Sequence, residues 1–179
     1  PEIPASARHA ATRLLIDSMG CALGGIDQPE SVALRALAAG STAATPATIW
    51  GSLEKTTPEA AALVNGVMIR CLDFNDDYFG GSGDLGPHPS DVIGALAAAV
   101  ESRGGCGRDL IDAIILAYEV VGRLVDVLEV GPGRVWDYTF VHGAGVALAA
   151  GRALGLDRDR LRHGLGIAGV CSIGLYQAR

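Results

Sequence analysis

The sequence predicts an all-α protein, on three observations. Apolar residues make up 49% of the 179 positions and aromatic residues only 5%, so the apolar mass is alanine, leucine, valine and isoleucine. That composition suits closely packed helices better than a sandwich of aromatic-rich sheets. Apolar residues recur at helical spacing along most of the chain, and glycine, proline and N-cap residues stand where the periodic segments stop.

The start of the chain predicts two helices and little else. Residues 7–23 carry apolar side chains on one face and end at a pair of glycines. Pro29 opens a shorter helix that ends near Gly40. Residues 41–48 form a loop, and Ile49-Trp50 is too short for more than a stub of strand.

The next helix leads to the residues of greatest chemical interest. Thr56 and Glu59 have the spacing of a capping box, with a proline in the first turn, and the helix that they begin runs to about Leu72. Arg70 and Asp73 lie three residues apart near its end, so they share one helix face.

The second half of the chain predicts four more helices. One begins around His88 and ends near Arg103, and the next, residues 108–128, has the strongest apolar stripe in the chain. An alanine- and glycine-rich helix follows and ends near Leu154. Asp157 is a good N-cap for the last helix.

Bulk properties exclude several classes of protein. The net charge is −6 and the basic residues are scattered, so nucleic acid is not expected as a partner. The chain has no signal peptide and no long apolar run, so we expect a cytoplasmic protein without a membrane span. The four cysteines lie far apart and fit neither a zinc finger nor a disulfide scaffold. Because Pro1 is not an initiator, we expect a piece of a longer chain.

Two short segments, 70–78 and 86–91, carry most of the information about function. The first ends a helix with one arginine and three acids: Arg70, Asp73, Asp76 and Asp77. The second brings a histidine to a helix start, where backbone N–H groups near Ser90 favour an anion such as a substrate carboxylate. Proton-transfer groups therefore lie next to anion-binding groups. The alternative without function is a solvated acidic helix end beside a glycine loop.

His88 is the strongest candidate for proton transfer. Histidine titrates near neutral pH, and a position before a proline at a helix start favours the neutral form that accepts a proton. A histidine that only caps the helix is the alternative. His142 lies in the alanine-rich helix and faces either the core or a cleft.

The aspartates offer three kinds of chemistry. If they converge, mutual repulsion makes one of them hold its proton closer to neutral pH, as a general acid or base requires. Arg70 opposes that effect for its nearest neighbour and is suited to clamp a carboxylate with two N–H groups. Asp73, Asp76, Asp77 and His88 could together hold a divalent metal instead.

Across essentially its whole length the chain resembles the MmgE/PrpD family, the 2-methylcitrate dehydratase-like lyases. The most specific matches are Leu72-Asp-Phe-Asn-Asp76 and His88-Pro-Ser-Asp91, and weaker ones include Ala61-Ala-Leu-Val-Asn-Gly66 and Leu154-Gly-Leu-Asp157. The resemblance implies that residues 1–179 are the N-terminal part of a multi-helix domain, truncated and without the family's α/β lid domain. It also implies a homodimer that needs no metal or organic cofactor.

The resemblance assigns roles residue by residue. It places Asp73 and His88 in the catalytic site, while Asp77 and Tyr138 stand where relatives usually have threonine and histidine. A tyrosine, with an ordinary pKa of about 10, is a poor base but can donate a proton, so Tyr138 is expected to be an auxiliary acid and Asp77 a further catalytic residue. Substrate binding falls to Arg70, Asn75 and Ser90. The family's catalytic lysine would lie just past Arg179, so this chain alone is expected to be inactive.

We therefore expect a cofactor-independent hydro-lyase that dehydrates a small di- or tricarboxylate of the 2-methylcitrate type, in propionate catabolism. Asn75, Arg70 and Asp91 look more like this branch of the family than like the cis-aconitate decarboxylases. The alternatives are decarboxylation of cis-aconitate, epimerisation of an acidic substrate, a helical assembly module without catalysis, and a metal-dependent hydrolase.

Overall fold

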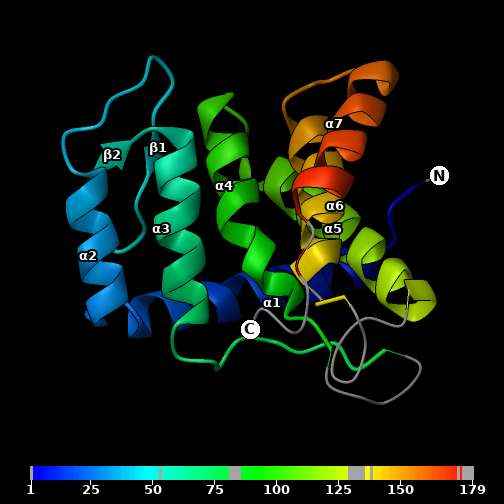
Figure 1. Cartoon of the computed structure of the whole chain (residues 1–179), viewed down its shortest axis with the longest axis horizontal. Coiled ribbons are helices and arrows are strands. Elements are labelled where there is room, and N and C mark those ends of the chain that lie inside the picture. The colour runs from blue at the N-terminus through cyan, green and yellow to red at the C-terminus, as the bar shows by residue number, and fades with distance from the viewer. Residues whose placement is uncertain are drawn as a thin grey trace.

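Seven α-helices, one 3₁₀ helix and a two-stranded hairpin make up the part of the chain that the computed structural model describes, namely residues 2–52, 54–80, 86–128, 136–137, 139–172 and 174 (Figure 1). The all-α prediction is confirmed. In chain order the elements are α1 (Ala5–Gly24), α2 (Pro29–Ala38), β1 (Ala47–Thr48), β2 (Lys55–Thr56), α3 (Pro58–Arg70), η1 (Pro89–Val92), α4 (Ile93–Ser102), α5 (Gly107–Leu128), α6 (Thr139–Ala153) and α7 (Arg158–Cys171).

α3 packs between α2 and α4, α4 also contacts α6, and α1 runs across one end of α3 and on to α5 (Figure 1). The α3–α4, α5–α6 and α6–α7 contacts are the most extensive. The main core gathers apolar side chains from α1, α3, α4, α5 and α6, and its largest fully buried members are Ile49, Met68, Ile69, Ile93, Leu96 and Ile114. None of the helices in the described ranges is long and apolar enough to cross a membrane.

Gly94 lets α4 approach α3 closely. A Cβ atom added to Gly94 would lie 2.7 Å from the backbone nitrogen of Gly66. The approach fixes the end of α3 beside η1, which precedes α4. The two segments that the sequence singled out are therefore brought together by backbone packing.

The N-terminal boundary of α3 differs from the prediction by one residue. Thr57 is the N-cap, and its hydroxyl accepts a hydrogen bond from Ala60 N. Thr56 lies in β2, where its hydroxyl donates to Ala38 O. The predicted strand stub at Ile49-Trp50 also falls two residues too late, because β1 is Ala47–Thr48. Both errors arise because the pairing of β1 with β2 places Ala47–Thr48 and Lys55–Thr56 in strands, and Thr56 is thereby removed from the helix start.

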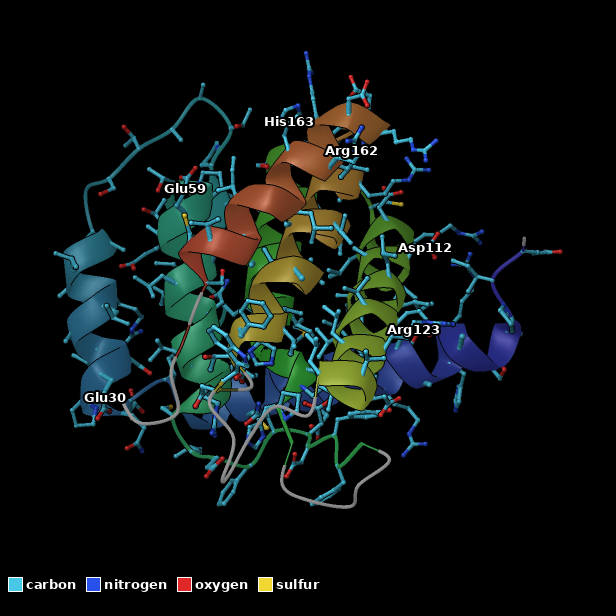
Figure 2. The ribbon with its side chains drawn as sticks, turned by 45° about the vertical axis from the view of Figure 1, so that its right-hand side comes forward. Glu30, Glu59, Asp112, Arg123, Arg162 and His163 are labelled. Carbon is cyan, nitrogen blue, oxygen red and sulfur yellow. The ribbon has the colours of Figure 1, made fainter. Side chains whose placement is uncertain are left out.

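The second half follows the prediction closely. The helix predicted from His88 begins as the 3₁₀ turn η1 and continues as α4. Asp157 caps α7 through a hydrogen bond from Arg160 N. On α5, Glu119 and Arg123 form an exposed ion pair, with Arg123 at the surface (Figure 2).

Candidate active site

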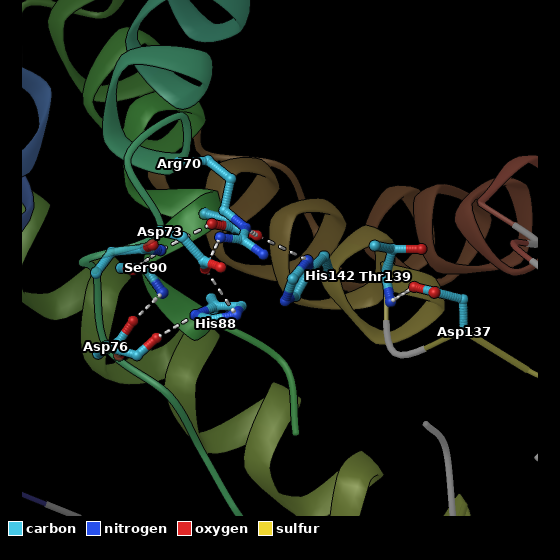
Figure 3. Close-up of polar contacts among 10 residues, drawn as sticks. Arg70, Asp73, Asp76, His88, Ser90, Asp137, Thr139 and His142 are labelled. Carbon is cyan, nitrogen blue, oxygen red and sulfur yellow. Dashed lines mark hydrogen bonds and ion pairs between the residues drawn. The ribbon is translucent and has the colours of Figure 1, made fainter. Parts of the chain in front are cut away.

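Five ionisable side chains from distant parts of the chain converge where α3 ends, η1 lies and α6 begins, and Figure 3 shows four of them, Arg70, Asp73, His88 and His142. Arg70 is the last residue of α3, Asp91 lies in η1, and His142 lies in the first turn of α6. The loop between α3 and η1 supplies Asp73 and His88. We call these five residues, with Asn75, the site cluster.

Asp73 owes its place to an unusual backbone conformation. Its φ is +56°, the only positive φ of a non-glycine residue in the described part of the chain. Such a conformation is unfavourable by roughly 1–3 kcal/mol and tends to occur at functional sites. The turn brings the carboxylate into an ion pair with the Arg70 guanidinium and to 3.7 Å from His88 Nε2.

The His88 ring is oriented by a backbone carbonyl. Its Nδ1 lies 2.7 Å from Asp76 O, and because a carbonyl only accepts, Nδ1–H is the donor. In the neutral ring the lone pair is therefore on Nε2, the atom that faces Asp73. The side chain is largely buried, with 13% exposed. This is the orientation that a proton acceptor needs.

Asp76 holds the loop in place. Its Oδ1 accepts from Ser90 N at 3.0 Å, and its Oδ2 accepts from Tyr118 OH at 2.8 Å. Burial, reinforced by Asp76, raises the pKa of Tyr118, so this hydroxyl keeps its proton and remains a donor. The Ser90 N–H and hydroxyl both have protein partners here, since Asn75 Nδ2 lies 2.8 Å from Ser90 Oγ. A role for Ser90 in binding substrate stays a prediction.

Asp91 is an acid that the sequence analysis placed only in a family motif. Asn75 Nδ2 donates to its Oδ1 at 2.9 Å, and Arg70 Nε lies 3.7 Å from its Oδ2. Burial raises the pKa of Asp91 to about 6, against the opposing effect of the Arg70 and His88 charges. Its position three residues after His88 at a helix start was the signal that could have identified it. Asn75, predicted to bind substrate, therefore contacts Asp91 and Ser90.

His142 faces the site cluster and also lines a groove. Its Nδ1 lies 3.9 Å from Asp91 Oδ2. Burial, assisted by the charge of His88, lowers the pKa of His142 to about 4, so the ring is neutral at neutral pH. Its buried Nε2 has no hydrogen-bond partner among the described residues. The sequence could not decide between core and cleft because that choice depends on how α6 packs against η1.

Two further predicted residues, Asp77 and Tyr138, are not members of the site cluster. No hydrogen bond or ion pair in the described ranges joins Asp77 to the site cluster, and its buried Oδ1 has no partner there. Tyr138 lies outside the described residues. The metal alternative finds no support in the same ranges, where no group of three or more His, Cys, Asp and Glu side chains could hold a metal ion. The Asp76 carboxylate is engaged by Ser90 and Tyr118 instead.

The arrangement combines three capabilities in a small volume. Arg70 is a cation suited to a carboxylate ligand. His88 presents a nitrogen that accepts a proton, and Asp91 is an acid that holds its proton close to neutral pH. Such a set supports removal of a proton next to a carboxylate, with the negative charge stabilised by Arg70.

Comparisons with known proteins agree with this interpretation of the site. The whole chain, residues 1–179, matches the MmgE/PrpD N-terminal domain, which confirms the resemblance predicted from the motifs. The cis-aconitate decarboxylase of Homo sapiens is 35% identical over 130 residues, or 68% of this chain and 26% of that protein. The 2-methylcitrate dehydratase of Cupriavidus necator is 31% identical over 178 residues, or 92% of this chain and 35% of that protein.

A second decarboxylase aligns with nearly the whole chain. The cis-aconitate decarboxylase of Aspergillus terreus is 29% identical across 99% of this chain, which is 37% of that protein. The chain thus spans 26% to 37% of the length of these three relatives. Relatives named for two different reactions match at similar identity, so identity alone does not choose between the reactions.

Proposed function

Because the chain belongs to the MmgE/PrpD family, we propose that it carries part of the active site of a lyase that dehydrates a small tricarboxylate of the 2-methylcitrate type. The observation that carries this proposal is the orientation of His88, whose Nε2 faces Asp73 beside the Arg70 guanidinium. The proposal rests on these contacts and on relatives that include 2-methylcitrate dehydratases.

In the proposed reaction each residue has a separate task. Arg70 binds a substrate carboxylate and stabilises the negative charge that develops on it. His88 Nε2 accepts the proton from the adjacent carbon. Asp73 stabilises the imidazolium that forms, because its carboxylate lies 3.7 Å from Nε2. The electrons of the broken C–H bond form the double bond as the hydroxyl leaves.

Dehydration is our first choice because Asn75 and Asp91 support it. Asn75 donates a hydrogen bond to Asp91, and both residues are among those by which the sequence resembles the dehydratase branch of the family. Decarboxylation of cis-aconitate is the second candidate, since relatives with that name match the chain at comparable identity.

We extend the proposal to the whole protein. The 179 residues would be the N-terminal part of its helical domain, with the lid domain and the catalytic lysine in the rest of the full-length protein. The protein would be a cytoplasmic homodimer without metal or organic cofactor. The exposed apolar side chains Ile167 and Val170 on α7, 64% and 73% exposed, are of the kind that assembly covers.

Activity of the full-length protein tests the function. The protein is incubated with 2-methylcitrate, citrate and cis-aconitate in the presence of EDTA, and the products are identified by mass spectrometry. We expect an unsaturated acid from 2-methylcitrate, and a fall in kcat of about 10²-fold or more for His88→Gln. Turnover of cis-aconitate alone would favour the decarboxylase, and wild-type activity in His88→Gln would refute the assigned base.

A further inference from the structure

We propose that Asp91 and His142 form a second proton-transfer pair of the site cluster. Asp91 is the acid that meets the substrate, and His142 is the positioning residue that supplies its replacement proton. The assignment rests on the proposed function and adds to it the group that protonates the leaving hydroxyl. The pair comes from η1 and α6, whereas His88 and Asp73 come from the loop after α3.

Arg70 lies near a member of each pair, namely Asp73 of the His88–Asp73 pair and Asp91 of the Asp91–His142 pair. Its Nη1 forms the ion pair with Asp73 (Figure 3). Its Nε lies 3.7 Å from Asp91 Oδ2. A substrate carboxylate held by this guanidinium therefore has His88 toward one side and Asp91 toward the other. Elimination needs a base and an acid at neighbouring atoms of the substrate, and this geometry supplies both.

The two carboxylate oxygens of Asp91 have different neighbours. Asn75 binds Oδ1, and both Arg70 and His142 lie near Oδ2. The charged or titratable groups that act on Asp91 are Arg70 from α3, His88 and Asp76 from the loop, and His142 from α6. Burial outweighs the cations among them, and Asp91 keeps its proton to about pH 6.

His142 is suited to serve Asp91 without displacing its proton. The groups that act on it are His88, Asp137, Asp76 and Arg70, besides Asp91 itself. Because the ring is buried and close to other cations, it remains neutral and adds no charge that would ionise Asp91. A buried imidazole nitrogen without a hydrogen-bond partner among the described residues is unusual in a structural position.

A groove gives this pair a route to solution. Asp91 and His142 line one groove of about 500 Å³ formed with residues of α4, α6 and α7. The other residues along it are mostly small or apolar, including Ala95, Val146 and Ala147. In this proposal the groove is the side from which a water molecule or a small base serves His142.

The proton balance closes without any further reactant. His88 Nε2 takes the proton from carbon, the C–H electrons form the C=C bond, and the C–O bond breaks. The leaving hydroxyl takes the Asp91 proton and departs as water. Asp91 then regains a proton from solvent through His142, and His88 returns its proton to solvent, so one substrate yields one alkene and one water.

The test uses Asp91→Asn and His142→Ala in the full-length protein, with His163→Ala as the matched control. His163 is an exposed histidine that projects from α7 (Figure 2). We expect kcat to fall about 10²-fold in Asp91→Asn with KM changed less than about threefold, and about 10-fold in His142→Ala. Added imidazole should restore kcat in His142→Ala and leave the control unchanged, which a merely structural role would not produce.

Titration of the Asp91 carboxyl separates this inference from the proposed function. Carbon-13 NMR of the full-length wild type, with Asp91→Asn to assign the signal, should show a midpoint near pH 6. Turnover by wild type with unchanged kcat in both variants would overturn the pair. So would an Asp91 midpoint near the ordinary value of about 4. If no substrate is turned over, the proposed function fails. The pair is then decided by whether His142→Ala changes the Asp91 midpoint, as the 3.9 Å contact between the two side chains requires.

Discussion

Glu101 and Asp91 stand at opposite ends of the segment formed by η1 and α4, and their surroundings differ sharply. Glu101 accepts three hydrogen bonds: from Thr48 Oγ1 at 2.6 Å, from Thr48 N at 2.8 Å and from Lys55 Nζ at 3.1 Å. Burial raises the pKa of Glu101, but these donors together lower it by more, so the net shift is downward. Asp91 has one donor amide and a cation at 3.7 Å, and its pKa rises to about 6.

The same contrast holds for the two asparagines of these regions. Asn65 belongs to the hairpin cluster, which we define as Thr48, Lys55, Asn65 and Glu101. It donates to Thr48 O and accepts from Trp50 N, so both ends of the amide are used. Asn75 of the site cluster donates twice, but its buried Oδ1 has no partner among the described residues. The Asn65 amide of the hairpin cluster has hydrogen-bond partners at both ends, whereas the Asn75 amide of the site cluster, to which we assign the chemistry, does not.

Removing the charge of Asp91 should produce the largest change in stability. A pKa raised from 3.8 to about 6 means that the ionised form is less stable in the folded state, by about 3 kcal/mol at neutral pH. We expect Asp91→Asn to increase the free energy of unfolding at neutral pH by up to this amount, measured by urea denaturation of the full-length protein.

The pH dependence of that gain has a definite sign. Because the folded-state pKa is raised, the contribution of Asp91 to stability is fully present below about pH 4 and is lost as pH rises through about 6. The advantage of Asp91→Asn should therefore vanish in acid. A variant that is less stable than wild type at neutral pH would show that Arg70 and Asn75 dominate the environment of this carboxylate.

Asp76 should behave as a structural residue although it lies beside the site cluster. Asp76→Ala leaves the Ser90 N–H and the Tyr118 hydroxyl without their acceptor. We expect a loss of about 2 kcal/mol in the free energy of unfolding. Tyr118→Phe is the matched control, because it removes one donor and leaves Asp76 bound to Ser90. Its free energy of unfolding should fall by less than that of Asp76→Ala. Equal losses would mean that Asp76 acts mainly through the tyrosine.

Glu101→Gln should destabilise the hairpin end, opposite in sign to Asp91→Asn. The glutamine keeps one acceptor oxygen and loses the charge, so we expect a loss of about 1 kcal/mol, reduced by solvent because the side chain is 35% exposed. Since the pKa of Glu101 is lowered, this contribution is present above its ordinary value and fades as pH falls through the folded-state pKa. A gain in stability would contradict the proposed contrast between the hairpin cluster and the site cluster.

The smallest effect should come from a helix cap remote from both clusters. Asp157→Ala removes the hydrogen bond to Arg160 N at the start of α7. We expect a loss of about 1 kcal/mol or less in the free energy of unfolding and no change in kcat. Asp159→Asn, on the same exposed turn, is the control for charge alone. A change in kcat would place α7 in the function of the site rather than at its border.

Local signals in the sequence determined most of the helices. Prolines in first turns, glycines after last turns and the Asp157 cap depend only on neighbours along the chain, and the predicted helices correspond to those in the described residues. The capping error between Thr56 and Thr57 shows the limit of such signals, because the β1–β2 pairing assigned Thr56 to a strand. The resemblance to the family was likewise readable from short motifs.

Four of the six residues of the site cluster were also readable, because Arg70, Asp73, Asn75 and His88 come from segments close in sequence. Asp91 and His142 required the tertiary structure, since their significance lies in burial and mutual distance rather than in residue type. The contact between η1 and α6 places His142 against Asp91, some fifty positions away along the chain. Charge and helix propensity are properties of a residue and its neighbours, whereas desolvation is a property of everything packed around it, so only the folded chain decides which carboxylate keeps its proton.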